Sequence, residues 1–342
     1  MAKIFVITYS TYGHINKLAE SVVKGLENNG VEVGRYQIAE TLSAEILEKM
    51  HAPAKADIPI ITVDQLPEAD GYLFGFPTRY GSAPAQVKAF FDATGGLWAK
   101  QALVGKPVGF FYSTASQHGG QEATVFSTMP FVAHHGLIYV PLGYTNSHLF
   151  DNSEVVGGSA WGAGTVANGD GSRMPSEKEL EIAVTQGERF ADGGQKRSTM
   201  TKIFVITYST FGHINKVAQS IVKGLEKGGV EVGRYQIAET LSDEILAKMH
   251  AAPKPDIPVL NPKDLPEADG YLFGFPTRYG TTPAQVKTFF DATGGLWTKQ
   301  ALAGKPAGFF FSTASQHGGQ EVTVLSSLPI LAHHGIIYVP LG

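Results

Sequence analysis

Residues 3–15 read KIFVITYSTYGHI, an apolar run that leads directly into a loop of hydroxyl residues, glycine and histidine. The run Ile4–Ile7 is short, β-branched and aromatic, which is typical of a buried strand. After the loop, apolar residues recur at helical spacing and form one face: Ile15, Leu18, Ala19, Val22 and Leu26. A strand, a short polar loop and an amphipathic helix predict the first unit of a parallel α/β sheet.

The same alternation continues along the chain. Four further runs predict strands: one that starts at Val31–Val33, and those at Gly71–Phe76, Val108–Tyr112 and Leu137–Val140. Helical patterns cover Ala85–Ala93 and a last helix from about Ser176, where Ser176–Glu179 reads as a capping box. We expect this last helix to bury one stripe: Leu180, Ala183, Val184, Gly187 and Phe190. Strands this apolar, separated by helices, predict a doubly wound five-stranded parallel sheet that is covered on both faces.

The chain then repeats itself. Residues 202–214 read KIFVITYSTFGHI, and one constant offset relates the two copies up to Gly342, the counterpart of Gly143. This period is far longer than a solenoid unit, so the repeat is a whole domain. We predict a complete domain at 1–191, a polar linker at 192–200, and a second domain at 201–342. The second domain lacks a counterpart of Tyr144–Thr199 and so lacks the final helix.

Composition excludes several classes of function. The net charge of −4 leaves no basic footprint for nucleic acid, and the absence of a run of 18 apolar residues predicts no membrane span. The lack of cysteine excludes thiolate catalysis and cysteine-ligated metals. His134 and His135 are adjacent and diverge by roughly 100° on a helix, so we expect no metal site there. No signal-peptide pattern opens the chain, and we expect a cytoplasmic location.

Ligands of such sheets bind beyond the carboxyl ends of the strands. Three loops lie there: Ser10–Ile15, Pro77–Gly81 and Ser113–Gly120. The first enters a helix N-terminus, which favours an anion, but it has no Lys or Arg and no G-x-G-x-x-G pattern. It suits the single phosphate of a mononucleotide, and it equally suits an N-capped helix without a ligand. Tyr80 could form the wall for a flat ring or belong to the core.

Six motifs in order then resemble one family: Thr11–His14, Pro77–Gly81, Thr94–Trp98, Gly119–Glu122, Ala133–Gly136 and Asp170–Arg173. They resemble the WrbA family, its fungal members in particular, over residues 1–191 and again over 201–342. Members of that family are flavodoxin-like FMN-dependent NAD(P)H:quinone oxidoreductases. The resemblance therefore implies a flavodoxin-like fold, present twice, with FMN as cofactor and NAD(P)H as co-substrate.

The resemblance also implies the site residues. It assigns the FMN phosphate to the first loop, the flavin ring to the second and its polar edge to the third, with a pocket histidine. In the first copy these are Ser10, Thr11, Tyr12, Gly13, His14, Ile15, Pro77, Thr78, Arg79, Tyr80, Gly81, Ser113, Thr114, Ala115, Ser116, Gln117, His118 and His134. In the second copy they are Ser209, Thr210, Phe211, Gly212, His213, Ile214, Thr277, Arg278, Tyr279, Ser312, Thr313, Ala314, Ser315, Gln316, His317 and His333. Substrates are implied to contact Tyr12, Trp98, His134, Trp297 and His333.

The implied mechanism is a hydride transfer from NAD(P)H to the flavin, followed by two-electron reduction of a quinone in the same cleft. It needs no side-chain nucleophile. Because members of the family normally form tetramers of single domains, we expect the two copies to pair and two chains to form a four-domain particle. Two alternatives stay open: a flavodoxin-type electron carrier, and a non-catalytic scaffold or stress protein of the same fold.

Overall fold

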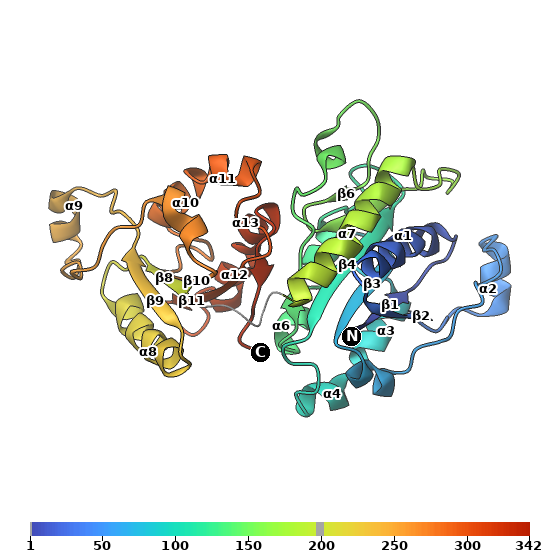
Figure 1. The fold of residues 1–342 in the computed structure, drawn as a ribbon, viewed down its shortest axis with the longest axis horizontal. Helices are drawn as coiled ribbons and strands as arrows, with labels where there is room; N and C mark the ends of the chain where they lie inside the picture. Colours follow the sequence, from blue (N-terminus) through green and yellow to red (C-terminus); the bar gives the residue numbers. More distant parts are fainter. Residues whose placement is uncertain (1, 196–201) are drawn as a thin grey trace. The chain divides into compact units, whose positions relative to one another are not determined.

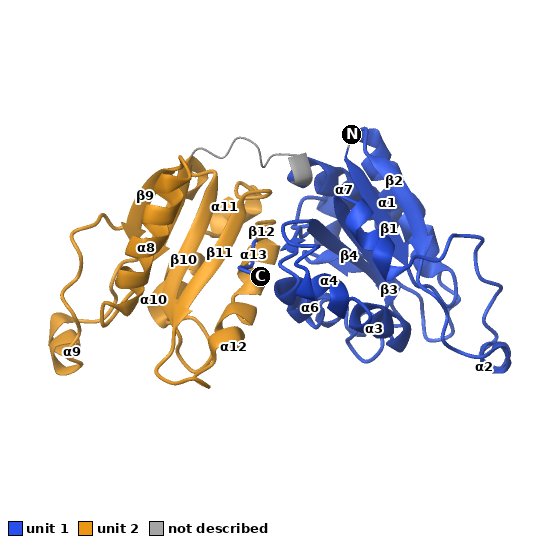
Figure 2. Ribbon diagram, turned by 90° about the horizontal axis from the view of Figure 1, so that it is seen from below, with its two compact units in different colours: residues 1–195, 339–342 blue, residues 196–338 orange. Residues whose placement is uncertain are grey.

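The computed structural model describes residues 2–195 and 202–342. The chain divides into two compact units, residues 1–195 with 339–342 (unit 1) and residues 196–338 (unit 2), coloured separately in Figure 2. The last helix of unit 1 continues to Gln195, past the expected start of the linker at 192, and its Ala191 and Gly193 are buried. The rest of the expected linker falls on residues 196–200, outside the described ranges, and the domain boundaries stay a prediction.

Unit 1 contains the predicted five-stranded parallel sheet (Figure 1). Its order is β2-β1-β3-β4-β5, and all neighbours are parallel. The strands are β1 (Lys3–Thr8), β2 (Glu32–Gln37), β3 (Gly71–Pro77), β4 (Pro107–Thr114) and β5 (Ile138–Tyr139). The fold class predicted from the sequence is therefore confirmed.

The fifth position of this sheet is shared by two strands, which we did not predict. β5 pairs with the start of β4, and β7 (Gly162–Val166) pairs in parallel with its end, from Tyr112 to Thr114. β3 occupies the other edge of β4, so β5 and β7 follow each other along one edge. A short strand, β6 (Gly158–Ser159), runs antiparallel to β7.

Helices cover the sheet of unit 1 on both faces (Figures 1 and 2). Helices α1 (His14–Asn28) and α7 (Glu177–Gln195) lie together on one face. The opposite face carries α3 (Ala85–Asp92), α4 (Gly95–Ala99) and α6 (Met129–His134), and α5 (Ala123–Phe126) precedes α6 in the chain. The remaining helices are α2 (Ala44–Lys49) and the 3-10 segments η1 (Val63–Glu68) and η2 (Ser147–Phe150).

Glycines allow α1 and α7 to pack with their backbones in contact. A Cβ on Gly25 would lie 2.1 Å from the Val184 carbonyl oxygen, and one on Gly187 would lie 2.2 Å from the Val22 carbonyl oxygen. Neither position can therefore carry a side chain without separating the helices.

The stripe that α7 buries differs from the predicted one. Its buried members are Glu179, Ile182, Ala183, Gln186, Gly187, Phe190, Ala191 and Gly193, while the predicted Leu180 and Val184 are only half-buried. The capping box is confirmed, since Ser176 N–H donates to Glu179 (2.8 Å) and Glu179 N–H donates to Ser176 Oγ (3.3 Å). The inward carboxylate of Glu179 turns the stripe toward positions 182 and 186, because these follow it at helical spacing.

Unit 2 repeats the sheet in the order β9-β8-β10-β11-β12. Its strands are β8 (Lys202–Thr207), β9 (Glu231–Gln236), β10 (Gly270–Pro276), β11 (Pro306–Ser312) and β12 (Ile337–Tyr338). Its helical segments are α8 (His213–Lys227), α9 (Asp243–Lys248), η4 (Pro262–Glu267), α10 (Ala284–Asp291), α11 (Gly294–Thr298), α12 (Gln320–Leu325) and α13 (Leu328–His333). Within residues 202–342 no element corresponds to β6, β7 or α7.

The missing helix changes the surface of α8. Leu18 on α1 is 0% exposed, whereas its counterpart Val217 is 44% exposed. A Cβ on Gly224, the counterpart of Gly25, would have nothing within 4 Å. None of the helices among the described residues combines the length and the apolar character that a membrane crossing requires.

Candidate functional site

The three loops singled out in the sequence meet in unit 1 at the carboxyl ends of β1, β3 and β4. They enclose a cavity of about 430 Å³, a size within the usual range of ligand pockets. The residues that line it are Ser10, Thr11, Tyr12, His14, Ile15, Met50, His51, Pro77, Thr78, Arg79, Ser113, Thr114, Ala115, Ala167, Asn168, Gly169, Asp170 and Gly171. The position agrees with the rule for parallel sheets.

One end of this cavity has the donors that a phosphate needs. Gly13 takes a left-handed conformation (φ 91°) at the start of α1, and its N–H donates to Ser10 Oγ at 3.0 Å. Thr11 is buried, and Arg79 Nη2 donates to its hydroxyl at 3.3 Å. Hydroxyls, the free N–H groups of a 15-residue helix and a guanidinium from another loop therefore converge. This donor set fits the phosphate monoester of FMN.

The second loop forms a tight turn that projects Tyr80 outward. Arg79 and Ser82 exchange backbone hydrogen bonds of 2.8 and 3.0 Å, and Thr78 Oγ1 accepts from Gly81 N–H at 3.1 Å. Tyr80 has a φ of 53° and is fully exposed, so it is not in the core and does not line the cavity. A bulky residue in this region carries backbone strain, which the turn must hold. Tyr279 repeats the arrangement with a φ of 54°.

The third loop divides between two cavities. Ser113 and Thr114 are buried and line the first cavity with Ala115. Gln117 and His118 instead line a polar cavity of about 830 Å³, which the segment 144–166 closes. The structure therefore separates the two ends of the loop that we expected to follow one edge of the flavin.

A fourth wall of the first cavity, residues 167–171, was not among the predicted site residues. Asp170–Arg173 stood out in the sequence as a family motif, but nothing in its pattern indicated this position. His14 connects the wall to α1, because its Nε2 lies 3.1 Å from the Gly171 carbonyl oxygen. This contact also explains why His14 is buried.

Glu179 holds the segment that leads into this wall. Its buried carboxylate accepts hydrogen bonds from Gly157 N–H (2.8 Å), Thr165 Oγ1 (2.8 Å) and Arg173 Nη1 (2.9 Å). Further N–H donors are Ser176 at 2.8 Å and Val166 at 3.2 Å. A buried carboxylate needs partners of this number to offset its lost hydration.

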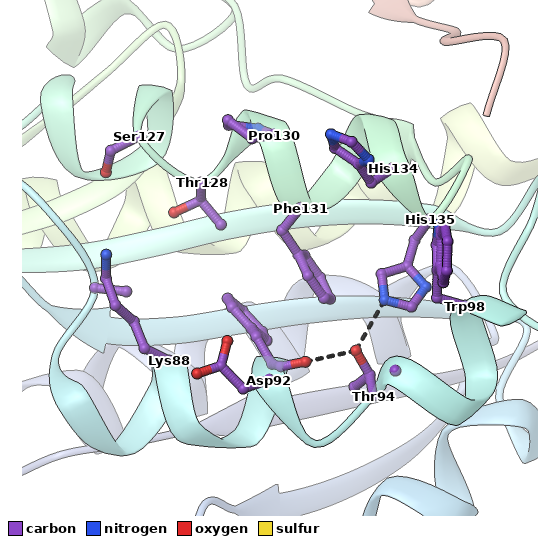
Figure 3. A pocket seen from close by; sticks show the side chains of 13 residues that line it. Lys88, Asp92, Thr94, Trp98, Ser127, Thr128, Pro130, Phe131, His134 and His135 are labelled. Carbon is purple, nitrogen blue, oxygen red and sulfur yellow. Dashed lines mark hydrogen bonds between the residues drawn. The ribbon is translucent and has the colours of Figure 1, made fainter.

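Trp98 and His134 line a different cavity from Tyr12. It measures about 490 Å³ and lies among α3, α4 and α6 (Figure 3). In it Phe91 stacks on Phe131 with ring centroids 4.0 Å apart. The structure thus brings together two of the predicted substrate residues of unit 1, but it does not bring them to the cavity of the three loops.

The neighbouring His135 is structural in this second cavity. Its Nε2 lies 2.8 Å from Thr94 Oγ1, which donates to the Phe91 carbonyl oxygen at 2.6 Å. Burial lowers the pKa of His135, and the adjacent His134 lowers it further. Unit 2 repeats this contact between Thr293 and His334 at 2.9 Å, on the elements that carry Trp297 and His333.

Unit 2 keeps the first two loops but not the fourth wall. Arg278 Nη2 donates to Thr210 Oγ1 at 3.1 Å, and Gly212 has a φ of 84°. Within residues 202–342 no segment corresponds to residues 167–171. His213, the counterpart of the buried His14, is exposed.

Comparisons with known proteins identify the family. A model of the family described as NADPH-dependent FMN reductase matches residues 2–151 and 201–342, which is most of the chain. The NAD(P)H quinone oxidoreductase YCP4 of Candida albicans is 57% identical over 197 residues, covering 57% of this chain and 68% of the relative. The quinone-oxidoreductase QR2 of Triphysaria versicolor is 54% identical over 187 residues, covering 54% of this chain and 91% of the relative.

Other matches have different names. The P25 protein of Schizosaccharomyces pombe is 53% identical over 189 residues, covering 55% of this chain and 94% of the relative. Among solved structures, a WrbA-like flavodoxin from Agrobacterium tumefaciens is 24% identical with a TM-score of 0.40, covering 58% of this chain and all of that one. Since the family model matches most of the sequence in two separate stretches, the chain belongs, with both of its copies, to the NADPH-dependent FMN reductase family.

Proposed function

We propose that the protein is an FMN-dependent NAD(P)H:quinone oxidoreductase. The observation that carries the proposal is the cavity at the ends of β1, β3 and β4, with hydroxyl, N–H and guanidinium donors at one end. Two relatives above 50% identity, which the chain matches over at least two thirds of their length, are named quinone oxidoreductases. When bound, FMN supplies the hydride chemistry, and the protein binds and orients the rings.

In unit 1, different residues would bind the phosphate, contact the ring system and exclude water. Ser10, Thr11 and the start of α1 would bind the phosphate, and Arg79 would balance its charge. Thr78 and the buried Ser113 and Thr114 would contact the ring system. The wall 167–171 limits the access of water to the cavity.

Flavin analysis tests the cofactor. Purified protein should be yellow and should release FMN on denaturation, which chromatography identifies. Ser10→Asp combined with Thr11→Asp should abolish binding, because two carboxylates would then face the phosphate. Release of FAD, or no flavin after incubation with excess FMN, would refute the assignment.

Steady-state kinetics test the activity. Oxidation of NAD(P)H with benzoquinone should give parallel lines in double-reciprocal plots, because both substrates use one cleft in turn. An electron carrier of the same fold would bind FMN but would not turn over NAD(P)H with a quinone, so this measurement also separates the two functions.

We further propose that the cavity of Trp98 and His134 completes the site of a neighbouring domain. The support is that this cavity shares no lining residue with the first one in unit 1. We therefore propose that the two copies pair and that two chains form a four-domain particle. Light scattering at micromolar concentration should give the mass of two chains, and the mass of one chain would contradict it.

A further inference from the structure

We propose that Lys55 and Glu40 position the phosphate-binding loop from behind, and that this pair makes the site prefer FMN over a flavin without a phosphate. The inference rests on the proposed FMN function and deepens it. Neither residue lines the first cavity, so their role is to position the loop rather than to contact the cofactor.

Glu40 is the centre of a hydrogen-bond network below the loop. Its carboxylate accepts from Thr41 N–H (2.9 Å), Leu42 N–H (3.0 Å) and the hydroxyl of Tyr9 (3.1 Å). Gln86, a buried residue of α3, donates to it at 3.0 Å. The carboxylate therefore connects the end of β1, the loop after residue 40 and α3.

Lys55 joins this network to the loop itself. Its Nζ lies 2.8 Å from Glu40 Oε2, donates to the Ser10 carbonyl oxygen at 2.9 Å, and lies 4.7 Å from the ring centroid of Tyr9. Ser10 is also the residue whose hydroxyl accepts from Gly13 N–H. Lys55 thus fixes the backbone of the residue on which the turn into α1 depends.

Lys55 also brings a cation to a loop that has none. No Lys or Arg lies between Thr8 and Asn16, so every nearby cation comes from elsewhere in the chain. Arg79 reaches Thr11 from the cavity, and Lys55 reaches Ser10 from behind. Burial alone would raise the pKa of Glu40, but hydrogen bonds from Lys55 and the Leu42 and Thr41 N–H groups hold that pKa at about 2. The ion pair therefore persists at neutral pH.

Unit 2 has the same arrangement. Lys254 Nζ lies 2.7 Å from Glu239, 3.3 Å from the Ser209 carbonyl oxygen and 4.9 Å from the ring centroid of Tyr208. The surrounding segments differ, HAPAKA at 51–56 against HAAPKP at 250–255, and unit 2 has no counterpart of α7 within residues 202–342. The contacts of the lysine are therefore kept when its neighbours and the fourth wall change.

Flavin titrations of the full-length apoprotein test the inference. FMN and riboflavin are titrated separately, and binding is read from the quenching of flavin fluorescence. Lys55→Met should raise the Kd for FMN about tenfold, as expected for losing one partly screened cation near a phosphate. The Kd for riboflavin should stay unchanged, and Lys55→Arg should restore most of the FMN affinity.

Lys49→Met is the matched control, because Lys49 forms an exposed pair with Glu45 (2.6 Å) on α2 and should leave both Kd values unchanged. Circular dichroism and melting of each apo variant establish that it folds. If Lys55→Met does not fold, Lys55→Gln removes the charge and the ion pair with Glu40 and should show the same selective loss.

The outcomes separate the inference from the function on which it rests. Failure of the unmodified protein to bind FMN would refute the proposed function. Normal FMN binding in that protein, with an unchanged Kd in the Lys55→Met variant or an equal loss for both flavins, would overturn the role of Lys55 alone.

Discussion

Replacing Glu179 by Gln should loosen the wall of the first cavity. The buried carboxylate accepts from Arg173, from the backbone N–H of Gly157 ahead of β7, and from that of Val166 at the end of β7. An amide has one oxygen, and its NH₂ group would face donors, so several of these hydrogen bonds cannot be made. The change therefore acts on the segment 157–173 through the loss of its acceptor.

The expected loss in the free energy of unfolding depends on the burial of the ion pair and on the hydrogen bonds that Arg173 retains. Breaking a buried ion pair costs about 3–5 kcal/mol. The Arg173 side chain is 22% exposed and also donates to the carbonyl oxygens of Val155 (2.9 Å) and Val166 (2.6 Å). We therefore expect a loss near the lower end, about 3 kcal/mol, out of a typical total of about 5–15 kcal/mol for a domain.

Trp161 reports this segment directly. It is buried, and its ring centroid lies 6.0 Å from that of Tyr139. With Trp98 and Trp297 replaced by Phe, denaturant unfolding followed by fluorescence reads Trp161 alone. Glu179→Gln should shift its transition to lower denaturant and raise the Kd for FMN, because the wall and the contact of His14 with Gly171 are lost together.

Glu181→Gln provides the matched control on the same helix. Glu181 is exposed and contacts His148 at 2.8 Å, so its loss should cost at most about 1 kcal/mol. A Glu179→Gln variant as stable as the control would refute the stated role of the buried carboxylate. A destabilised variant with unchanged FMN affinity would show that the wall does not contribute to the binding site.

Three further predictions concern the units and their sites. Residues 201–342 alone should be insoluble or free of flavin, residues 1–199 alone should bind FMN, and the intact chain should hold nearer one FMN than two; a soluble 201–342 fragment with equal affinity would contradict this. Burial, and after it the charge of His333, lowers the pKa of His334 to about 4. Between pH 6.5 and 4 the unfolded state therefore binds more protons than the folded state, and the free energy of unfolding should decrease by up to about 3 kcal/mol as the pH is lowered through this window. His334→Gln should remove this pH dependence from unfolding curves followed at Trp297. Trp98→Ala should lower kcat/KM for quinone while FMN is retained, whereas loss of FMN with unchanged turnover per flavin would make Trp98 structural.

Much of the fold could be predicted because its strands are buried on both faces. Such strands are continuous apolar runs, and those of β1, β3 and β4 are visible without any partner. The segment of β6 and β7 reads GSAWGAGTV, which is rich in small residues and has no clear period. It forms strands because β4 offers a free edge and because side chains satisfy its backbone, as Gln186 does for Ala163 N–H at 2.9 Å. Both β4 and Gln186 are distant from this segment in the sequence, so the local sequence pattern did not predict its strands.

The candidate site likewise contains residues that the sequence predicted and residues that it did not. The three predicted loops converge because each follows a strand of one parallel sheet, and topology alone brings them together. Lys55 and residues 167–171 reach the site from segments that follow no predicted strand, through contacts with Ser10 and His14. Their roles depend on long-range geometry that spacing along the chain does not encode.

The two copies allow a comparison of the same helix with and without α7 packed against it. α1 and α8 have nearly the same sequence, the same 15-residue length and the same left-handed glycine before the first residue. Leu18 is nevertheless 0% exposed and Val217 is 44% exposed. The loop and helix that would bind a phosphate therefore form without α7, because their hydrogen bonds are local or come from Lys254 and Arg278. The closed cavity needs the segment from β6 to α7, which within the described residues only unit 1 contains.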